Sequence, residues 1–167
     1  MPYRSLLLAA LFTVPPGMAA ETTFQGHAVE LDAASAVRQV LRVTGTRYAI
    51  PGSPEQIVGR AQMCLSRKQS MAGVVSVDRD AGRLTAVSRV EYRDALALRL
   101  AKGWITVEAG EGFFSIALTK IGILQASTGE TADEVFSPLA LGGKHAWEPA
   151  LAAVIGVEQA LVDCMFG

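Results

Sequence analysis

Residues 50–92 carry the sequence IPGSPEQIVGRAQMCLSRKQSMAGVVSVDRDAGRLTAVSRVEY, and this stretch decides the fold. Ser53 is followed by Pro54 and, three positions after the serine, by Gln56. This is the pattern of a helix N-cap with proline at the first helical position and a capping-box partner at the third. The apolar residues that follow recur with the helical period at Ile57, Ala61, Cys64 and Leu65. We therefore expect a helix that begins after Ser53 and buries the Cys64 thiol.

A β-hairpin is predicted after this helix. Val75 and Val77 alternate with polar residues, residues 80–83 have the composition of a turn, and alternation resumes at Leu84. The apolar side chains of the second strand are Leu84, Ala86, Val90 and Tyr92. Because strand side chains alternate between faces, we expect these four to point toward the helices.

Short motifs in this stretch resemble those of a known family. They are Ile50-Pro51-Gly52 with Ser53, the helix residues Ile57, Val58 and Ala61, and the later Asp80-x-Gly82-x-Leu84. The chain from Tyr48 to its last predicted helix is similar to DUF4468, a small bacterial domain of unknown function described as having a TBP-like (TATA-binding-protein-like) fold. The resemblance implies a β-α-β-β-β-β-α order and brings no activity with it.

The first 20 residues, MPYRSLLLAALFTVPPGMAA, have the order of a secretory signal peptide. A positive charge at Arg4 precedes an apolar run, a proline break and two small residues. The apolar run is too short to cross a hydrocarbon core, which needs about 20 residues. We expect cleavage after Ala20, a single mature domain over residues 21–167, a periplasmic or secreted location, and no stable membrane insertion.

The charge balance excludes one class of partner. The chain has 15 Lys and Arg residues against 16 Asp and Glu residues, a formal net charge of −1. Proteins that bind nucleic acids carry a basic excess that neutralises phosphates. We therefore expect no nucleic-acid partner.

The segment 21–47 has no single clear pattern. Asp32 is placed to cap a short helix that runs to Leu41, and β-branched residues then suit a strand that ends near Ile50. Phe24 and Val29 suit an edge strand. The alternative for this segment is a loosely packed N-terminal arm.

The second half of the chain alternates and then becomes helical. Residues 94–102 fit either a strand or a helix, and we favour the strand, with Gly103 marking a bulge. A turn over 109–112 leads to a strand over 113–124 and then to a loop with one helical turn near 133–136. A closing helix is predicted over 147–166, with an apolar stripe at Trp147, Leu151, Val154, Leu161 and Met165.

These elements predict an α+β fold in which two principal helices pack on one face of an antiparallel sheet of four or more strands. Cys64 and Cys164 lie on the apolar faces of the two helices. An exported chain meets an oxidising environment, so we expect the two cysteines to form a disulfide.

The sequence matches no catalytic or metal-binding motif. Residues 142–145, Gly-Gly-Lys-His, only partly match a phosphate loop. That motif needs a glycine at position 138, where Pro138 stands, and a hydroxyl at position 145, where His145 stands. His27 and His145 fall in segments predicted as loop or edge, so we expect them to be solvated. The spacing of the two histidines and two cysteines matches no compact zinc site. We predict no cofactor, no metal and no catalytic residue.

One surface has the composition of a binding site. Thr85, Val87 and the residues that alternate with the inward side chains should share the outer face of the sheet. This predicts a binding surface composed of Arg89, Glu91, Arg93 and Trp104, since arginine and tryptophan are enriched at interfaces. The alternative is an ordinary solvated face with Trp104 in the core.

The favoured hypothesis is an exported, non-enzymatic binding protein. Its sheet face, or a cleft between helices and sheet, would hold a protein partner or an apolar ligand. The alternatives are an accessory subunit of an envelope assembly and an enzyme of unrecognised type.

Overall fold

The structure is a computed structural model that describes residues 19–34, 36–67, 72–124, 135–142 and 146–167. Residues 1–18 of the predicted signal peptide lie outside the described residues, as does His145.

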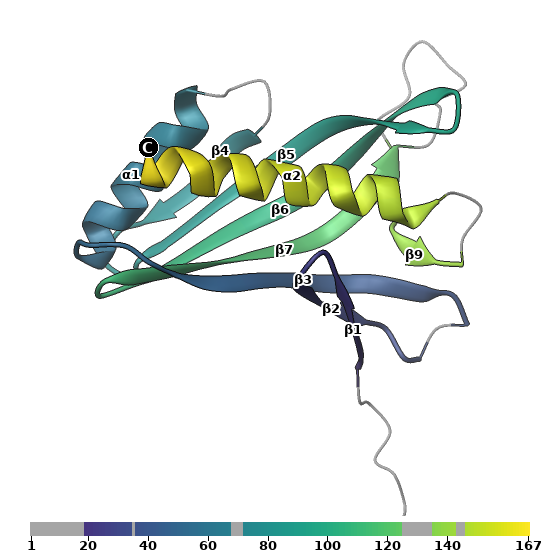
Figure 1. The fold of residues 1–167 in the computed structure, drawn as a ribbon, viewed down its shortest axis with the longest axis horizontal. Coiled ribbons are helices and arrows are strands. Elements are labelled where there is room, and N and C mark those ends of the chain that lie inside the picture. Colours follow the sequence, from purple (N-terminus) through teal and green to yellow (C-terminus); the bar gives the residue numbers. More distant parts are fainter. Residues whose placement is uncertain (1–18, 35, 68–71, 125–134, 143–145) are drawn as a thin grey trace, which may run out of the picture.

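An antiparallel sheet forms the body of the molecule, and two helices cover one of its faces (Figure 1). The strand order is β1-β2-β3-β7-β6-β5-β4, with β8 paired to β7 and β9 paired to β3. The predicted α+β fold is confirmed. The elements are β1 (Ala20–Phe24), β2 (His27–Leu31), β3 (Arg38–Ala49), α1 (Pro54–Arg67), β4 (Ala72–Asp78), β5 (Arg83–Asp94), β6 (Ala97–Gly110), β7 (Phe113–Leu124), β8 (Phe136–Pro138), β9 (Ala140–Leu141) and α2 (Trp147–Phe166).

Helix α1 begins where the capping pattern predicts. The Ser53 N–H donates to Gln56 Oε1 at 3.0 Å, and the Gln56 N–H donates to Ser53 Oγ at 3.4 Å. This reciprocal pair satisfies two backbone donors that the first helical turn leaves without partners. The buried face of α1 consists of Ile57, Val58, Ala61, Cys64 and Leu65.

The β4–β5 hairpin forms as predicted, with one local difference. Gly82 occupies the left-handed region (φ 63°) in the turn, a conformation that glycine adopts without steric cost. The β4–β5 register shifts between Val74 and Ser76, and Val75 is exposed. A bulge adds one residue to one strand, so side-chain alternation is interrupted there.

Strand β6 decides between the two interpretations of residues 94–102. β5 and β6 form twelve consecutive pairs, from Arg83 with Glu108 to Asp94 with Ala97, so the strand interpretation is confirmed. The register between β6 and β7 shifts beside Gly103. A Cβ atom at Gly103 would lie 3.0 Å from Val154 Cγ1, so the glycine also lets α2 approach the sheet closely.

The N-terminal segment is a set of strands. β1 and β2 form a hairpin, and β3 pairs with both β2 and β7. The predicted helix from Asp32 to Leu41 is therefore wrong. The Ala34 N–H donates to Asp32 Oδ1 at 2.9 Å, so the aspartate closes a turn instead of capping a helix. Val29 and Leu31 of β2 are buried, which favours the edge-strand alternative for this segment over the loose arm.

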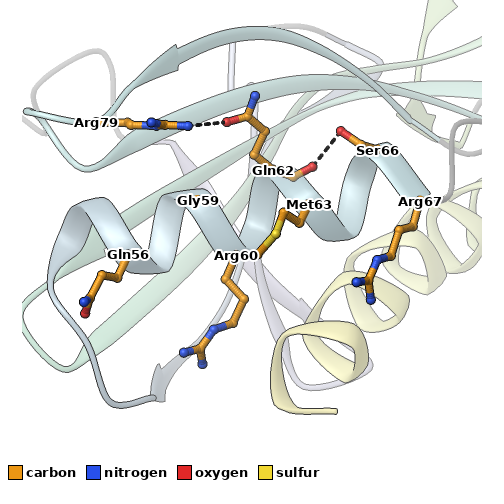
Figure 2. Close-up of a pocket in the computed structure, with 8 residues that line it drawn as sticks. All are labelled: Gln56, Gly59, Arg60, Gln62, Met63, Ser66, Arg67 and Arg79. Carbon is orange, nitrogen blue, oxygen red and sulfur yellow. Dashed lines mark hydrogen bonds between the residues drawn. The ribbon is translucent and has the colours of Figure 1, made fainter.

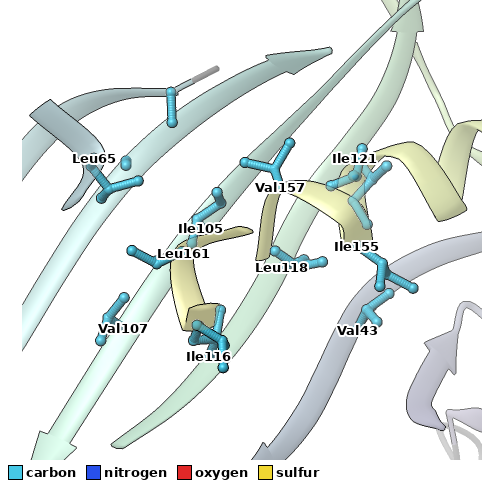
Figure 3. Packing of buried hydrophobic residues seen from close by; sticks show 14 of the residues in the cluster. Val43, Leu65, Ile105, Val107, Ile116, Leu118, Ile121, Ile155, Val157 and Leu161 are labelled. Atoms are coloured by element: carbon cyan, nitrogen blue, oxygen red, sulfur yellow. The ribbon is translucent and has the colours of Figure 1, made fainter. Parts of the chain in front are cut away.

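Helix α2 is the predicted closing helix, and it is apolar because it covers the sheet. Its length and composition would suffice to cross a membrane, but it packs on β5, β6 and β7. Figure 3 shows side chains of α2 among those of the strands, including Ile155, Val157, Leu161, Val43, Ile105, Val107, Ile116 and Leu118. The predicted helical turn near 133–136 lies mostly outside the described residues, and Phe136 begins β8 instead.

Cys64 of α1 and Cys164 of α2 form the predicted disulfide. The two sulfur atoms are 2.02 Å apart and the two Cα atoms are 5.9 Å apart. The bond joins the last turn of each helix, so the two helices meet at one end of the sheet (Figure 1). Disulfides persist in oxidising compartments and are rare in the cytosol, so this bond favours a non-cytoplasmic location.

Candidate functional site

The face of the sheet opposite the helices carries the four residues predicted as a binding surface. Along β5 the buried side chains are Leu84, Ala86, Ser88 and Tyr92. Arg89, Glu91 and Arg93 alternate with them and are exposed. Residues paired directly across two strands share a face, and Val87 pairs with Trp104. We call this side the open face, with Val87, Arg89, Glu91, Arg93, Leu98, Leu100, Lys102, Trp104 and Lys120 as its members.

Trp104 lies half-buried on the open face rather than in the core. The ammonium group of Lys120 lies 4.5 Å from the centroid of the indole ring, a distance typical of a cation–π contact. Lys120 reaches the ring from the β7 bulge, where its φ is 49°. A second ammonium group, that of Lys102, lies 5.1 Å from the centroid of the Phe136 ring.

The open face has a basic half and a neutral half. Its members near the end of the β5–β6 hairpin include four basic side chains, Arg89, Arg93, Lys102 and Lys120, and one acidic side chain, Glu91. At the opposite end, Arg83 Nη2 lies 3.0 Å from Glu108 Oε1, and the two charges offset each other. The basic half therefore has the potential that attracts an acidic surface.

The end of the β5–β6 hairpin adds apolar surface that the sequence interpretation did not single out. Leu96 is 99% exposed and Leu98 is 62% exposed. Among the described residues, β4 pairs with β5 as far as Ser88 and β7 pairs with β6 as far as Ala101, while β5 and β6 pair with each other as far as Asp94 and Ala97 (Figure 1). Exposed leucines next to arginines are a common composition for a contact surface.

A buried pair of titratable side chains, His27 and Glu158, lies on the helix side of the sheet. His27 Nε2 is 3.1 Å from Glu158 Oε2, and the two side chains are 12% and 1% exposed. His27 Nδ1 lies 3.0 Å from the Gln25 carbonyl oxygen, which can only accept, so Nδ1 carries a proton. The expectation that His27 is solvated is therefore wrong.

The contact between His27 and Glu158 requires one further proton, held either by the carboxyl group or by Nε2. Glu158 Oε1 has no hydrogen-bond partner and lies against the backbone of Gly45. Burial raises the pKa of Glu158, and the nearby His27 lowers it by a smaller amount. The pair joins the β1–β2 hairpin to α2.

We expect Glu158→Gln to change how stability depends on pH. Because the folded-state pKa of Glu158 is raised above its ordinary value of 4.5, the stability contributed by its protonated form is complete below that value. It is lost as pH rises through the raised pKa. Thermal unfolding of wild type and Glu158→Gln across the acid-to-neutral range should show the variant gaining relative stability as pH rises.

The matched control for this prediction is Glu148→Gln, which changes an exposed glutamate on the same helix. The amide group that Glu158→Gln introduces can still donate to His27 Nε2, so the neutral hydrogen bond is preserved. If the difference in melting temperature between wild type and Glu158→Gln is the same at every pH, the raised pKa of Glu158 is contradicted.

A shallow hollow of about 840 Å³ lies along the exposed side of α1 (Figure 2). Its lining consists of Gln56, Gly59, Arg60, Gln62, Met63, Ser66, Arg67 and Arg79. A smaller hollow of about 320 Å³ shares Arg60, Met63 and Arg67 and reaches the disulfide and Phe166. The spacing within α1 predicts only its buried side, and Arg79 and Phe166 join this surface from other elements.

No group of three or more His, Cys, Asp or Glu side chains within the described ranges could hold a metal ion. The linings of the two hollows along α1 contain neither histidine nor carboxylate side chains, and both cysteines that line the smaller one are in the disulfide.

Comparison with known proteins supports the fold. No protein-family model and no curated protein matches the sequence. A DUF4468 family protein from Bacteroides ovatus ATCC 8483 has a similar structure, with a TM-score of 0.56 and 16% identity over 75% of this chain and 87% of that chain. A TBP-like protein from Parabacteroides distasonis ATCC 8503 has a TM-score of 0.53 and 12% identity over 75% of this chain and 94% of that chain.

The resemblance inferred from the short motifs is therefore confirmed at the level of the fold, which is TBP-like. The core order β3-α1-β4-β5-β6-β7-α2 matches the order that the resemblance implies. The descriptions of the two similar structures name no activity.

Proposed function

We propose that this chain is an exported, non-enzymatic binding protein whose open face contacts a protein partner. The observation that carries the proposal is the one-sided cover of the sheet. Both helices lie on one face, while the other presents Trp104 beside a cluster of basic side chains. An exposed face with an aromatic residue and arginines has the composition typical of protein interfaces.

The packing of the helix side favours the open face over a ligand cleft. Val154, Leu151 and Leu161 of α2 are almost fully buried, as are Leu84, Ile105 and Leu118 of the strands below them. Side chains packed to this degree leave little room for an apolar ligand between α2 and the sheet. A protein partner is therefore the occupant that we propose.

The proposal places the protein in the periplasm or outside the cell. Two observations support export: the disulfide and the order of residues 1–20. Mass spectrometry of periplasmic or secreted protein should give the mass of a chain that begins at Glu21. A cytosolic chain that retains Met1 would contradict export while leaving the fold unaffected.

Affinity capture from the producing cell's envelope tests the open face. We expect the double variant Arg93→Glu/Trp104→Ala to retain at most about a tenth of the partner that wild type retains, because loss of a central aromatic or arginine commonly costs more than a factor of ten in affinity. The matched control is Arg38→Glu, which changes an exposed charge of β3 outside the open face. Equal capture by wild type and the open-face variant would count against the proposal, provided that both melt at similar temperatures.

A further inference from the structure

The exposed side of α1 has a regular pattern of its own. Arg60 and Arg67 are seven residues apart, Met63 lies between them, and Gly59 and Ser66 are the small residues that precede each arginine. Residues at this spacing share one side of a helix. Figure 2 shows the Arg60 and Arg67 side chains extending from the same side of α1.

This side of α1 is a groove with a wall on each flank. One wall contains Arg79, whose Nη2 donates to Gln62 Oε1 at 3.3 Å. The other wall contains Phe166, which is 55% exposed, and the disulfide. Met63, which is 57% exposed, lines both hollows and adds apolar surface between the two arginines. A methionine side chain adapts readily to the surface that covers it.

The charged side chains that line the groove are all arginines, namely Arg60, Arg67 and Arg79. Neither of its two hollows is lined by an Asp or Glu side chain. Within the described part of the chain, Arg60 and Arg67 form no ion pair. Arg79 differs, because Asp78 and Asp80 line a neighbouring hollow with it. Arg60 and Arg67 are therefore the two arginines available to an acidic partner.

The spacing of the two arginines favours a helical partner segment over an extended one. Seven residues of α-helix rise about 10.5 Å. A second helix that lies along α1 repeats its side chains at the same interval, so glutamates seven residues apart would meet both arginines. In an extended strand, side chains on one face recur about every 6.8 Å and fit this interval poorly. Gly59 and Ser66 leave room for a close approach, since a Cβ atom at Gly59 would meet nothing within 4 Å.

We propose that the α1 groove, formed by Arg60, Met63 and Arg67 between Arg79 and Phe166, docks an acidic amphipathic helix of a partner protein. Glutamates of that helix pair with Arg60 and Arg67, and an apolar residue between them covers Met63. A second copy of this chain fits poorly, because α1 against α1 would bring arginines together. The groove lies on the helix side of the sheet, so this contact is separate from the open face and is compatible with a partner bound there.

The test is a binding titration of the full chain with synthetic helices. The probe is a fluorescein-labelled peptide of about 21 residues, or three heptads, with Glu at every seventh position beside a Leu and Ala seam. Its matched control carries Lys in place of Glu. We expect wild type to bind the Glu peptide, with an affinity that falls as salt is added.

Reversing the charge of the two arginines should make the protein prefer the Lys peptide over the Glu peptide. Arg60→Glu/Arg67→Glu is expected to bind the Glu peptide about tenfold more weakly or worse, because two attractions become two repulsions, and to favour the Lys peptide. Both positions are outside the buried face of α1, and circular dichroism and melting temperature verify that the variant is folded. Arg93→Glu/Trp104→Ala, on the open face, should bind the Glu peptide as wild type does.

Three results would overturn the proposal. They are no binding of the Glu peptide by wild type, equal binding of the Glu and Lys peptides, and an affinity that Arg60→Glu/Arg67→Glu leaves unchanged. Phosphatidylglycerol vesicles form a further arm. If wild type binds them through the same two arginines more tightly than it binds the Glu peptide, the groove serves an anionic lipid surface and the proposed helix is wrong.

Discussion

Replacing Cys64 and Cys164 by serine is expected to lower the free energy of unfolding by roughly 2–5 kcal/mol. The disulfide closes a loop with a sequence separation of 100. For such a loop the chain-entropy model gives about 4.7 kcal/mol, an upper estimate because the unfolded chain retains some structure. Since domains of this size commonly have a total of about 5–15 kcal/mol, the loss is a large share of the stability.

Chemical denaturation of the oxidised wild type and of the double serine variant measures this difference. The corresponding fall in melting temperature should be about 2–4 °C for each kcal/mol lost. Wild type in dithiothreitol is the matched control, because reduction breaks the same bond without changing the sequence. If the oxidised and reduced proteins unfold at the same denaturant concentration, the disulfide does not add to the free energy of unfolding and the prediction is wrong.

Phe114→Ala is expected to lower the free energy of unfolding by about 3–5 kcal/mol. Phe114 is fully buried in β7, and its ring stacks on Tyr48 of β3 with centroids 5.0 Å apart. The Phe166 ring of α2 lies 6.2 Å away. Truncation removes the contacts that join two strands to the end of α2 and leaves a cavity that close-packed neighbours fill only in part.

Phe166→Ala is the matched control for this prediction. It truncates the same side-chain type in the same cluster, but Phe166 is 55% exposed. Its effect should be smaller, about 1 kcal/mol or less, because little apolar area is removed from burial. If the two variants lose the same free energy of unfolding in urea, Phe114 contributes less to stability than its burial indicates.

Local signals in the sequence predicted the elements that depend on neighbouring residues. The Ser53 and Gln56 capping pair placed the start of α1, and Gly82 marked the turn between β4 and β5. The bounds of α2 followed from its apolar period. In each case the determining contacts lie within a few residues of one another, where spacing in the sequence carries the information.

The error over residues 32–41 has a tertiary cause. Val37, Val40 and Leu41 fit one side of a helix, yet only Val40 is buried in the structure, while the other two are about half exposed. Pairing with β2 on one side and β9 on the other supplies backbone hydrogen bonds to the first residues of β3. That pairing outweighs the helix preference of a short segment, and nothing within the segment signals it.

The candidate site was predictable only in part. Strand alternation was enough to place Arg89, Glu91 and Arg93 on one face. The contact between Lys120 and Trp104 depends on a bulge, which shifts the alternation of β7. The contact between His27 and Glu158 joins residues 131 positions apart, and Glu158 stands within the apolar stripe between Val154 and Leu161. A lone carboxylate in such a stripe indicates that a buried partner is needed, but it does not identify His27 as that partner.

The open face and the α1 groove lie on opposite sides of the same sheet. Each carries a basic excess in a chain whose formal net charge is −1. Two separate contact surfaces would suit a protein that holds two partners, with the sheet between them fixing their distance. The variants at Trp104 and at Arg60 distinguish the two contacts.

The most direct test of the central claim is site-specific photo-crosslinking in the envelope of the producing cell. The photoreactive residue p-benzoylphenylalanine would replace Leu98 on the open face and, as a matched position, exposed Gln159 on α2. If the open face holds a protein partner, Leu98 should give an adduct of one discrete mass, and Gln159 should not. No adduct at Leu98, or the same adduct at both positions, would contradict the claim.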